Sequence, residues 1–89
     1  MALDFPNASR SFDEARNAVR FTGYDGMFEI AFLVETDALA RTAKGAKPAS
    51  EAEWLVAFDA ARGAVLDVAR RAYSGRKRPT YLLTAELFR

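Results

Sequence analysis

The sequence predicts a single α+β domain in which a small antiparallel sheet packs against one long helix. Apolar and polar residues alternate over residues 16–24 and 27–35, the period of a β-strand, with a turn between the two runs. Apolar residues then recur at steps of three and four over about 51–73, the period of a helix. A chain of 89 residues can bury one hydrophobic core, so the domain is expected to span residues 1–89.

The N-terminal residues 1–15 predict a short edge strand followed by a polar turn. Pro6 ends the extended run that begins at Leu3, because proline cannot donate to a strand ladder. Ser9, Arg10 and Ser11 then predict a turn.

The two alternating runs predict a hairpin joined at Asp25-Gly26. This dipeptide suits the two positive-φ positions of a type I′ turn. A two-residue loop at this place pairs Tyr24 with Met27 and therefore Phe21 with Ile30. The pair of Phe21 and Ile30 lies on the apolar face of the hairpin. On the other face it sets these charges opposite or diagonal to one another: Arg16 to Glu35, and Arg20 to Glu29.

Two helices and a last strand follow the hairpin. Thr36 can cap a short helix over about 37–43, and Ser50 with Glu53 forms the capping box of the long helix over about 51–73. Gly63 inside that helix costs about 1 kcal/mol relative to alanine, which predicts a close backbone approach there. Gly75 is expected to end the helix, and a short C-terminal strand follows Pro79. The apolar stripe of the long helix comprises Trp54, Phe58, Ala61, Val65, Val68 and Ala72.

Several short runs occur in a characteristic order. They are Leu3–Pro6, Ser9–Asp13, Val19–Gly23 and Glu29–Phe32, followed by Phe58, Arg62, Val65 and Ala69 in the long helix. Their order and spacing resemble those of the small bacterial proteins of domain of unknown function family 1488. The resemblance covers nearly the whole chain and implies a compact bacterial α+β domain. It implies no activity, cofactor or catalytic residue.

The composition excludes several classes of active site. The chain has no histidine and no cysteine, which removes imidazole bases, thiol nucleophiles and thiolate zinc sites. No glycine-rich phosphate loop and no calcium-loop spacing occurs. We therefore expect no catalytic residue, no metal and no cofactor. An enzyme built on tyrosine, arginine and carboxylates is the remaining catalytic alternative.

Basic residues gather toward the C-terminus. Residues 62–89 carry seven basic and two acidic side chains, whereas residues 1–61 carry six and ten. The candidate binding residues for an anion or nucleic acid are Arg62, Arg70, Arg71, Arg76, Lys77 and Arg78. The alternative is structural: cations stabilise a helix C-terminus through its dipole and keep a small domain soluble. Arg62 in particular could brace the sheet by reaching Glu29 or Glu35.

Apolar residues on the outer face of the sheet suggest association with another chain. Leu33 faces away from the core set of its strand, and Tyr81–Leu83 must also show an apolar side outward. A homodimer through a sheet face or edge, or a protein partner, is the resulting hypothesis.

The sequence thus favours a non-enzymatic bacterial protein-interaction or accessory domain. The alternative is a nucleic-acid-associated regulator that uses the basic segment 70–78. The longest uncharged run, Pro79–Ala85, is too short to cross a bilayer, and Asp4 interrupts any N-terminal signal core. We therefore expect no membrane association and a cytoplasmic location.

Overall fold

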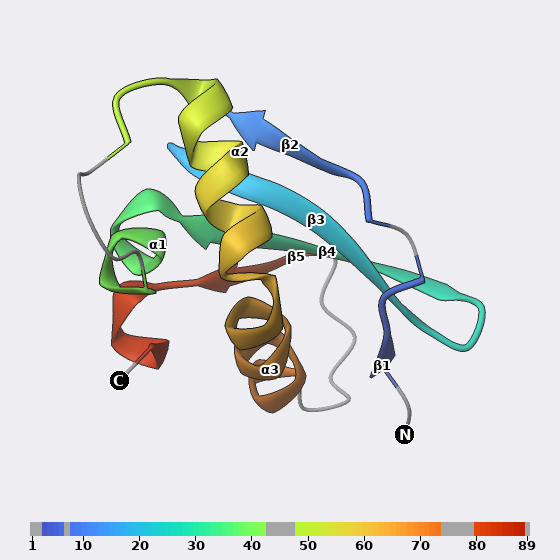
Figure 1. Ribbon diagram of the computed structural model, residues 1–89. Coiled ribbons are helices and arrows are strands. Elements are labelled where there is room, and N and C mark those ends of the chain that lie inside the picture. The colour runs from blue at the N-terminus through green and yellow to red at the C-terminus, as the bar shows by residue number, and fades with distance from the viewer. Residues whose placement is uncertain (1–2, 7, 43–47, 74–79, 89) are drawn as a thin grey trace.

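The computed structural model describes residues 3–6, 8–42, 48–73 and 80–88. Its class is α+β, as predicted, with a five-stranded sheet on one side and the helices on the other (Figure 1). The strands are β1 (Leu3–Asp4), β2 (Arg10–Asp13), β3 (Ala18–Asp25), β4 (Phe28–Glu35) and β5 (Thr80–Leu83). The helices are α1 (Thr36–Thr42), α2 (Glu51–Ala60), α3 (Arg62–Ala72) and the short 3-10 helix η1 (Ala85–Leu87).

The N-terminal region forms two strands rather than one. Both β1 and β2 pair antiparallel with β3, one at each end of it. The prediction of a turn at Ser9–Ser11 is wrong, since Arg10 and Ser11 already lie in β2. A strand forms here because successive side chains alternate in exposure: Phe12 packs against the core, whereas its neighbour Ser11 points to solvent.

The β3–β4 hairpin forms with the predicted faces but in a different register. Phe21 pairs with Phe32 instead of Ile30, and the loop is Gly26-Met27 instead of Asp25-Gly26. Of the two loop residues only Gly26 has a positive φ (61°), as the first loop position of a type II′ turn requires. The shift is two residues along one strand, so every side chain keeps its face.

The shifted register removes both predicted charge pairs. Arg20 now lies opposite Leu33, and Glu29 lies opposite Tyr24. Arg16 lies before the strand and bonds to Asp13 at 3.3 Å.

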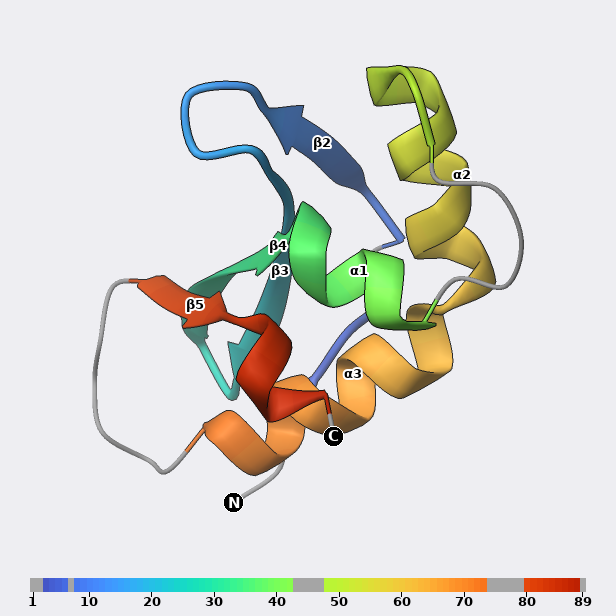
Figure 2. The same ribbon diagram turned by 90° about the vertical axis from the view of Figure 1, so that its left-hand side faces the viewer.

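The C-terminal strand β5 is the one departure from an antiparallel sheet. It runs parallel to β4 at the sheet edge, with Phe32 beside Tyr81. The chain reaches it by a long crossover through α1, α2 and α3, which a parallel connection requires. Figure 2 shows β5 at the edge with η1 directly after it.

The predicted long helix is two helices that change direction at Ala61 (Figure 1). Ala61 has φ −100° and ψ 9°, outside the helical range, although its N–H still bonds back to Ala57. The break keeps both Phe58 and Val65 fully buried against a twisted sheet. Gly63 lies just after it, with no atom within 4 Å of the place where a side chain would begin, so the expected close backbone approach is wrong.

The helix starts agree with the sequence. Ser50 Oγ accepts from Glu53 N–H at 3.2 Å, and the Glu53 carboxylate accepts from Ala49 N–H at 3.0 Å. Helix α1 begins at Thr36, one residue before the predicted start, and its predicted end at Ala43 lies outside the described residues, as does the predicted stop at Gly75.

An aromatic stack fills the core between the sheet and the helices. Phe21 and Phe32 stack at 5.3 Å between ring centroids, and Tyr81 continues the stack at 5.5 Å from Phe32. Phe58 of α2 packs on Phe21 at 5.2 Å, which joins helix to sheet. The core therefore draws on every layer of the fold. Its largest fully buried side chains are Phe32, Phe58, Leu39, Leu83, Val19, Val34 and Val65.

Candidate functional site

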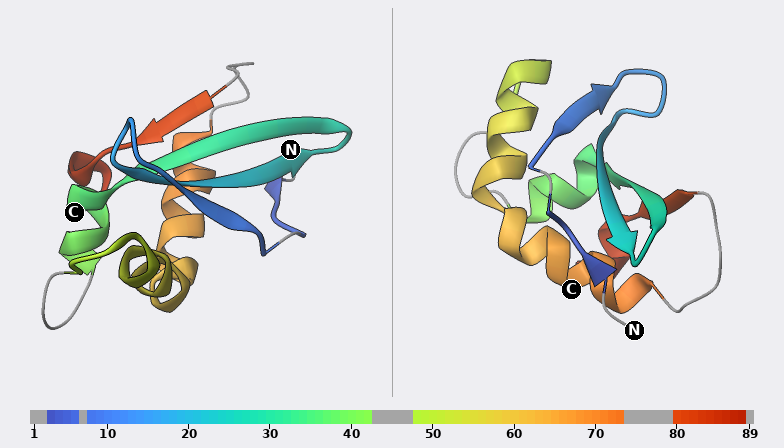
Figure 3. Two further views of the ribbon diagram at one scale, coloured as in Figure 1. Left: turned by 90° about the horizontal axis from the view of Figure 1, so that it is seen from above. Right: turned by 90° about the vertical axis from the view of Figure 1, so that its right-hand side faces the viewer.

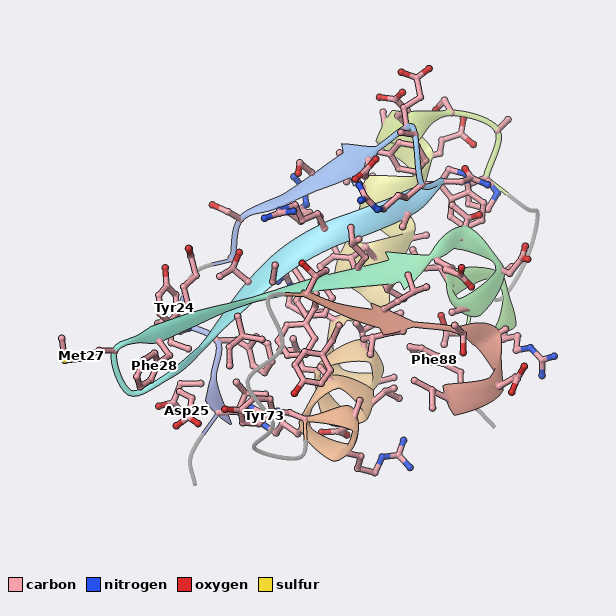
Figure 4. The ribbon with its side chains drawn as sticks, turned by 180° about the vertical axis from the view of Figure 1, so that it is seen from behind. Tyr24, Asp25, Met27, Phe28, Tyr73 and Phe88 are labelled. Atoms are coloured by element: carbon pink, nitrogen blue, oxygen red, sulfur yellow. The ribbon has the colours of Figure 1, made fainter. Side chains whose placement is uncertain are left out.

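The end of the β3–β4 hairpin projects beyond the helices and carries exposed apolar side chains. Figure 3 shows the hairpin extending past the rest of the sheet, and Figure 4 shows Met27 and Phe28 at its tip. Met27 is 96% exposed and Phe28 is 60% exposed. Both follow directly from the Gly26-Met27 turn, which places Met27 in the loop and Phe28 at the first strand position after it. Together with Tyr24 and Asp25, we call these residues the hairpin end.

The hairpin end is anchored to the body by a tyrosine. The hydroxyl of Tyr73, at the end of α3, donates to the Asp25 carboxylate. Phenol ionisation beside that carboxylate is unfavourable, because it would break the hydrogen bond and bring two anions together, so the pKa of Tyr73 is raised to about 12. Tyr73 therefore stays a hydrogen-bond donor throughout the physiological range.

A second tyrosine–carboxylate pair lies on the outer side of the hairpin. The Tyr24 hydroxyl donates to Glu29 at 3.3 Å, and the negative charge of Glu29 raises the pKa of Tyr24. Tyr24 also lines an open hollow of about 630 Å³ together with Asp4, Phe5, Pro6 and Gly26. The hairpin itself thus carries carboxylates beside its end, while one cation, Arg70, lies over the Phe5 ring at the same hollow.

The sequence supports this acidic character over a longer stretch. Between Arg20 and Arg41 the chain has no lysine or arginine, whereas it has four acidic residues: Asp25, Glu29, Glu35 and Asp37. A surface with one sign of charge favours a partner of the opposite sign.

Arg62 belongs to a structural ion-pair cluster. Its guanidinium donates to Asp59 at 2.9 Å and to the Ala8 carbonyl at 3.1 Å, and it lies over the ring of Phe58 at 4.8 Å. Arg10 of β2 donates to both oxygens of Asp59, at 3.0 and 2.8 Å. The predicted reach of Arg62 to Glu29 or Glu35 is wrong, because Asp59 and the chain before β2 are nearer partners.

This cluster shifts the ionisation of its members. Hydrogen bonds from Arg10 hold the pKa of Asp59 below its usual value, and Arg62 adds to the effect. The same contact raises the pKa of Arg10. One carboxylate thus ties β2 to the junction between α2 and α3.

The remaining basic candidates are not brought together with Arg62. Arg62 begins α3, whereas Arg70 and Arg71 lie in its last turn, about 12 Å further along the helix axis. Arg70 is 3.9 Å from Asp67, as the helical spacing predicts, and its guanidinium carbon lies 5.1 Å from the Phe5 ring centroid. Arg71 is exposed. The other candidates lie outside the described residues: Arg76, Lys77 and Arg78.

The described residues show neither a metal-binding cluster of acidic side chains nor a membrane-spanning helix. Among residues 3–6, 8–42, 48–73 and 80–88, no group of three acidic side chains is placed to hold a metal ion. Within those ranges, none of the helices is long and apolar enough to span a bilayer.

Sequence reasoning missed the hairpin end because it placed the turn one residue too early. With Asp25-Gly26 as the loop, Met27 becomes a paired strand residue and its exposure is hidden. The signal was present in the run Gly26-Met27-Phe28, since a type II′ turn needs glycine only at its first position.

Comparison with known proteins gives a family but no characterised relative. Residues 3–84 match the model of a family described as "Protein of unknown function (DUF1488)". No curated protein and no solved structure matches the chain.

Proposed function

The chain belongs to the DUF1488 family of proteins of unknown function, and from that premise we propose that it is a non-enzymatic accessory domain that binds a protein partner through its hairpin end. The observation that carries this proposal is the exposure of Met27 and Phe28 at the projecting tip of an anchored hairpin. Methionine and aromatic side chains are enriched in protein interfaces.

The anchoring of the hairpin supports the same role. A tip held by the Tyr73–Asp25 hydrogen bond and by strand pairing with β1 loses little conformational entropy when a partner binds. Flexible methionine can adapt to the partner, while Phe28 supplies a rigid ring with a large contact area.

The surrounding charge indicates the chemistry of the partner. Asp25 pairs with Phe28, Glu29 follows it, and Asp4 pairs with Tyr24 of the same hairpin end. Within the hairpin the nearest cation in sequence is Arg20. The partner surface that fits this arrangement is an apolar groove bordered by lysine or arginine.

The test uses the purified chain as bait in a lysate of its source cells, with and without nuclease and at low and moderate salt. The wild type is compared with the double variant M27S/F28S and with V56S, which alters an exposed aliphatic residue on α2. We expect the wild type and V56S to capture the same protein, and this capture to persist after nuclease treatment. M27S/F28S is expected not to capture that protein. Equal capture by all three baits would contradict the proposal.

A second candidate function is nucleic-acid binding by the basic segment 70–78. The charge asymmetry favours it, since residues 62–89 carry seven basic and two acidic side chains and Arg71 is exposed near the end of α3. The variant R76A/K77A/R78A is then expected to bind duplex DNA more weakly than the wild type at low salt, with a shallower salt dependence. Unchanged binding would remove this candidate.

A further inference from the structure

The outer face of the sheet is a second surface, separate from the hairpin end. Figure 4 views this face, with α2 and α3 lying behind the sheet. The face has a groove of about 430 Å³. Its lining residues are Arg16, Arg20, Leu33, Glu35, Thr80 and Leu82.

The apolar part of the groove is a pair of leucines on neighbouring strands. Leu33 of β4 lies directly beside Leu82 of β5 in the register. Leu33 is 3% exposed, whereas Leu82 is 49% exposed, and both line the groove. Leu82 is therefore the apolar side chain that this face presents to solvent.

The charged part of the groove carries both signs. Arg20 lies opposite Leu33 on β3, and Glu35 lies two residues beyond Leu33 on β4. Within the described part of the chain, neither Arg20 nor Glu35 forms an ion pair. Arg20 is exposed and Glu35 is partly exposed, so both can contact another chain. Arg16 differs, because Asp13 already binds it.

We infer that this face binds a second copy of the chain, with Arg20 of each copy against Glu35 of the other. In a two-fold contact, residue i meets residue j and residue j meets residue i. A two-fold axis in the plane of the interface, midway between Arg20 and Glu35, exchanges these two positions. With strands about 4.8 Å apart and same-face residues about 6.6 Å apart, that axis also passes close to Leu33 and Leu82. The half-exposed Leu82 side chains of the two copies then meet close to the axis, beside the two ion pairs, whereas Leu33 stays covered within its own chain.

The area of the face limits the affinity that two copies of the chain can have for each other. Strands β3 and β4 have eight residues each, about 26 Å of length, and four strands span about 14 Å. Since β2 and β5 have only four residues each, the flat area is at most about 370 Å². This is smaller than the roughly 800 Å² per partner of a stable interface. The dimer is therefore weak, and it forms at concentrations from tens of micromolar to about 1 mM.

Sedimentation of the purified chain between about 10 µM and about 1 mM tests the inference. We expect the mean mass of the wild type to rise toward the dimer over this range. L82E is expected to stay monomeric, while V56E, a matched change at an exposed aliphatic residue of α2, associates like the wild type. A wild-type chain that stays monomeric, or a dimer that L82E leaves intact, overturns the inference.

A charge exchange identifies the residues in contact. R20E and E35R each place like charges together twice, so each is expected to weaken the dimer at least tenfold. The double variant R20E/E35R restores both pairs in reversed sense and is expected to return the dissociation constant to within about threefold of the wild type. Failure of the double variant to recover, with circular dichroism showing each variant folded, overturns the assignment. The assay contains only this chain, so it is independent of the proposed function and its hairpin end.

Discussion

Two glycines of this chain differ in what a methyl group would meet. At Gly23, a Cβ atom would lie 2.7 Å from Cε1 of Phe5 and 3.2 Å from the Phe32 ring. Phe5 cannot retreat without loss, because it packs on Phe21 and Phe32 at 5.9 and 5.8 Å between centroids. At Gly63 the corresponding space is open. Gly23 is thus required for close packing of the N-terminal segment over β3.

Alanine substitutions at these two glycines are expected to have opposite effects. Gly23→Ala overpacks the Phe5 contact and lowers the free energy of unfolding by about 1–3 kcal/mol. Gly63→Ala lies in a helix with free space around it and raises that free energy by about 0.5 kcal/mol. Urea denaturation of the two variants beside the wild type measures both effects. A Gly23→Ala protein as stable as the wild type would show that Phe5 is free to move.

Asp59 makes stability depend on pH. Its folded-state pKa is lowered by Arg10 and Arg62, so the unfolded chain binds this proton more readily than the folded one. The contribution of Asp59 is therefore fully present above its ordinary pKa of 3.8 and is lost as the pH falls through the lower folded-state value. The partners are partly exposed, so we expect Asp59→Asn to cost only about 0.5–1 kcal/mol at pH 7.

The measurement for Asp59 is the urea midpoint of the wild type and Asp59→Asn between pH 7 and pH 2. The gap between the two proteins is expected to narrow as the pH falls below 3.8 and to close below the lowered folded-state pKa, where the folded wild-type chain also binds the proton. If the difference in urea midpoint stays constant down to pH 2, the charge of Asp59 in the Arg10–Asp59–Arg62 cluster is not its cause.

At the scale of elements, the sequence could predict faces but not register or direction. The period of two places Phe21 and Ile30 on the core side, and a two-residue shift leaves both on that side. The turn itself was ambiguous, because Gly26 can occupy the second position of one turn type or the first of another. The choice depends on tertiary contacts, among them the stacking of Phe21 on Phe32 and the bond from Tyr73 to Asp25.

The helix break and the parallel strand have the same kind of cause. The change of direction at Ala61 could not be predicted from the apolar stripe between Trp54 and Ala72. The stripe continues with helical spacing on both sides of the break. The direction of β5 depends on where the preceding helices deliver the chain, which no local pattern encodes. Of the candidate site, the pairing of Asp59 with Arg62 was predictable from helical spacing, whereas the second partner, Arg10, is 49 residues away in sequence.

At the scale of the whole molecule, one core joins the two ends of the chain. Leu83 of β5 is fully buried in the same cluster as Trp54 of α2 and Leu3 of β1. A domain of 89 residues is stable by about 4–13 kcal/mol, so the loss of one such side chain removes a large share of the total.

Leu83 and Leu82 differ in how much they contribute to that shared core. Leu83→Ala is expected to lower the free energy of unfolding by about 2–5 kcal/mol, whereas Leu82→Ala, one residue away and half exposed, changes it by less than about 1 kcal/mol. Because Trp54 is the single tryptophan, its fluorescence reports on α2, and far-ultraviolet circular dichroism reports on the whole backbone. Both signals are expected to give the same lowered urea midpoint for Leu83→Ala, since a chain with one core unfolds in one step. A Trp54 transition that stays at the wild-type midpoint while the circular dichroism shifts would show that β5 detaches on its own. The sheet edge would then be a separate cooperative unit, and the outer face would not be rigid enough to hold a second copy in register.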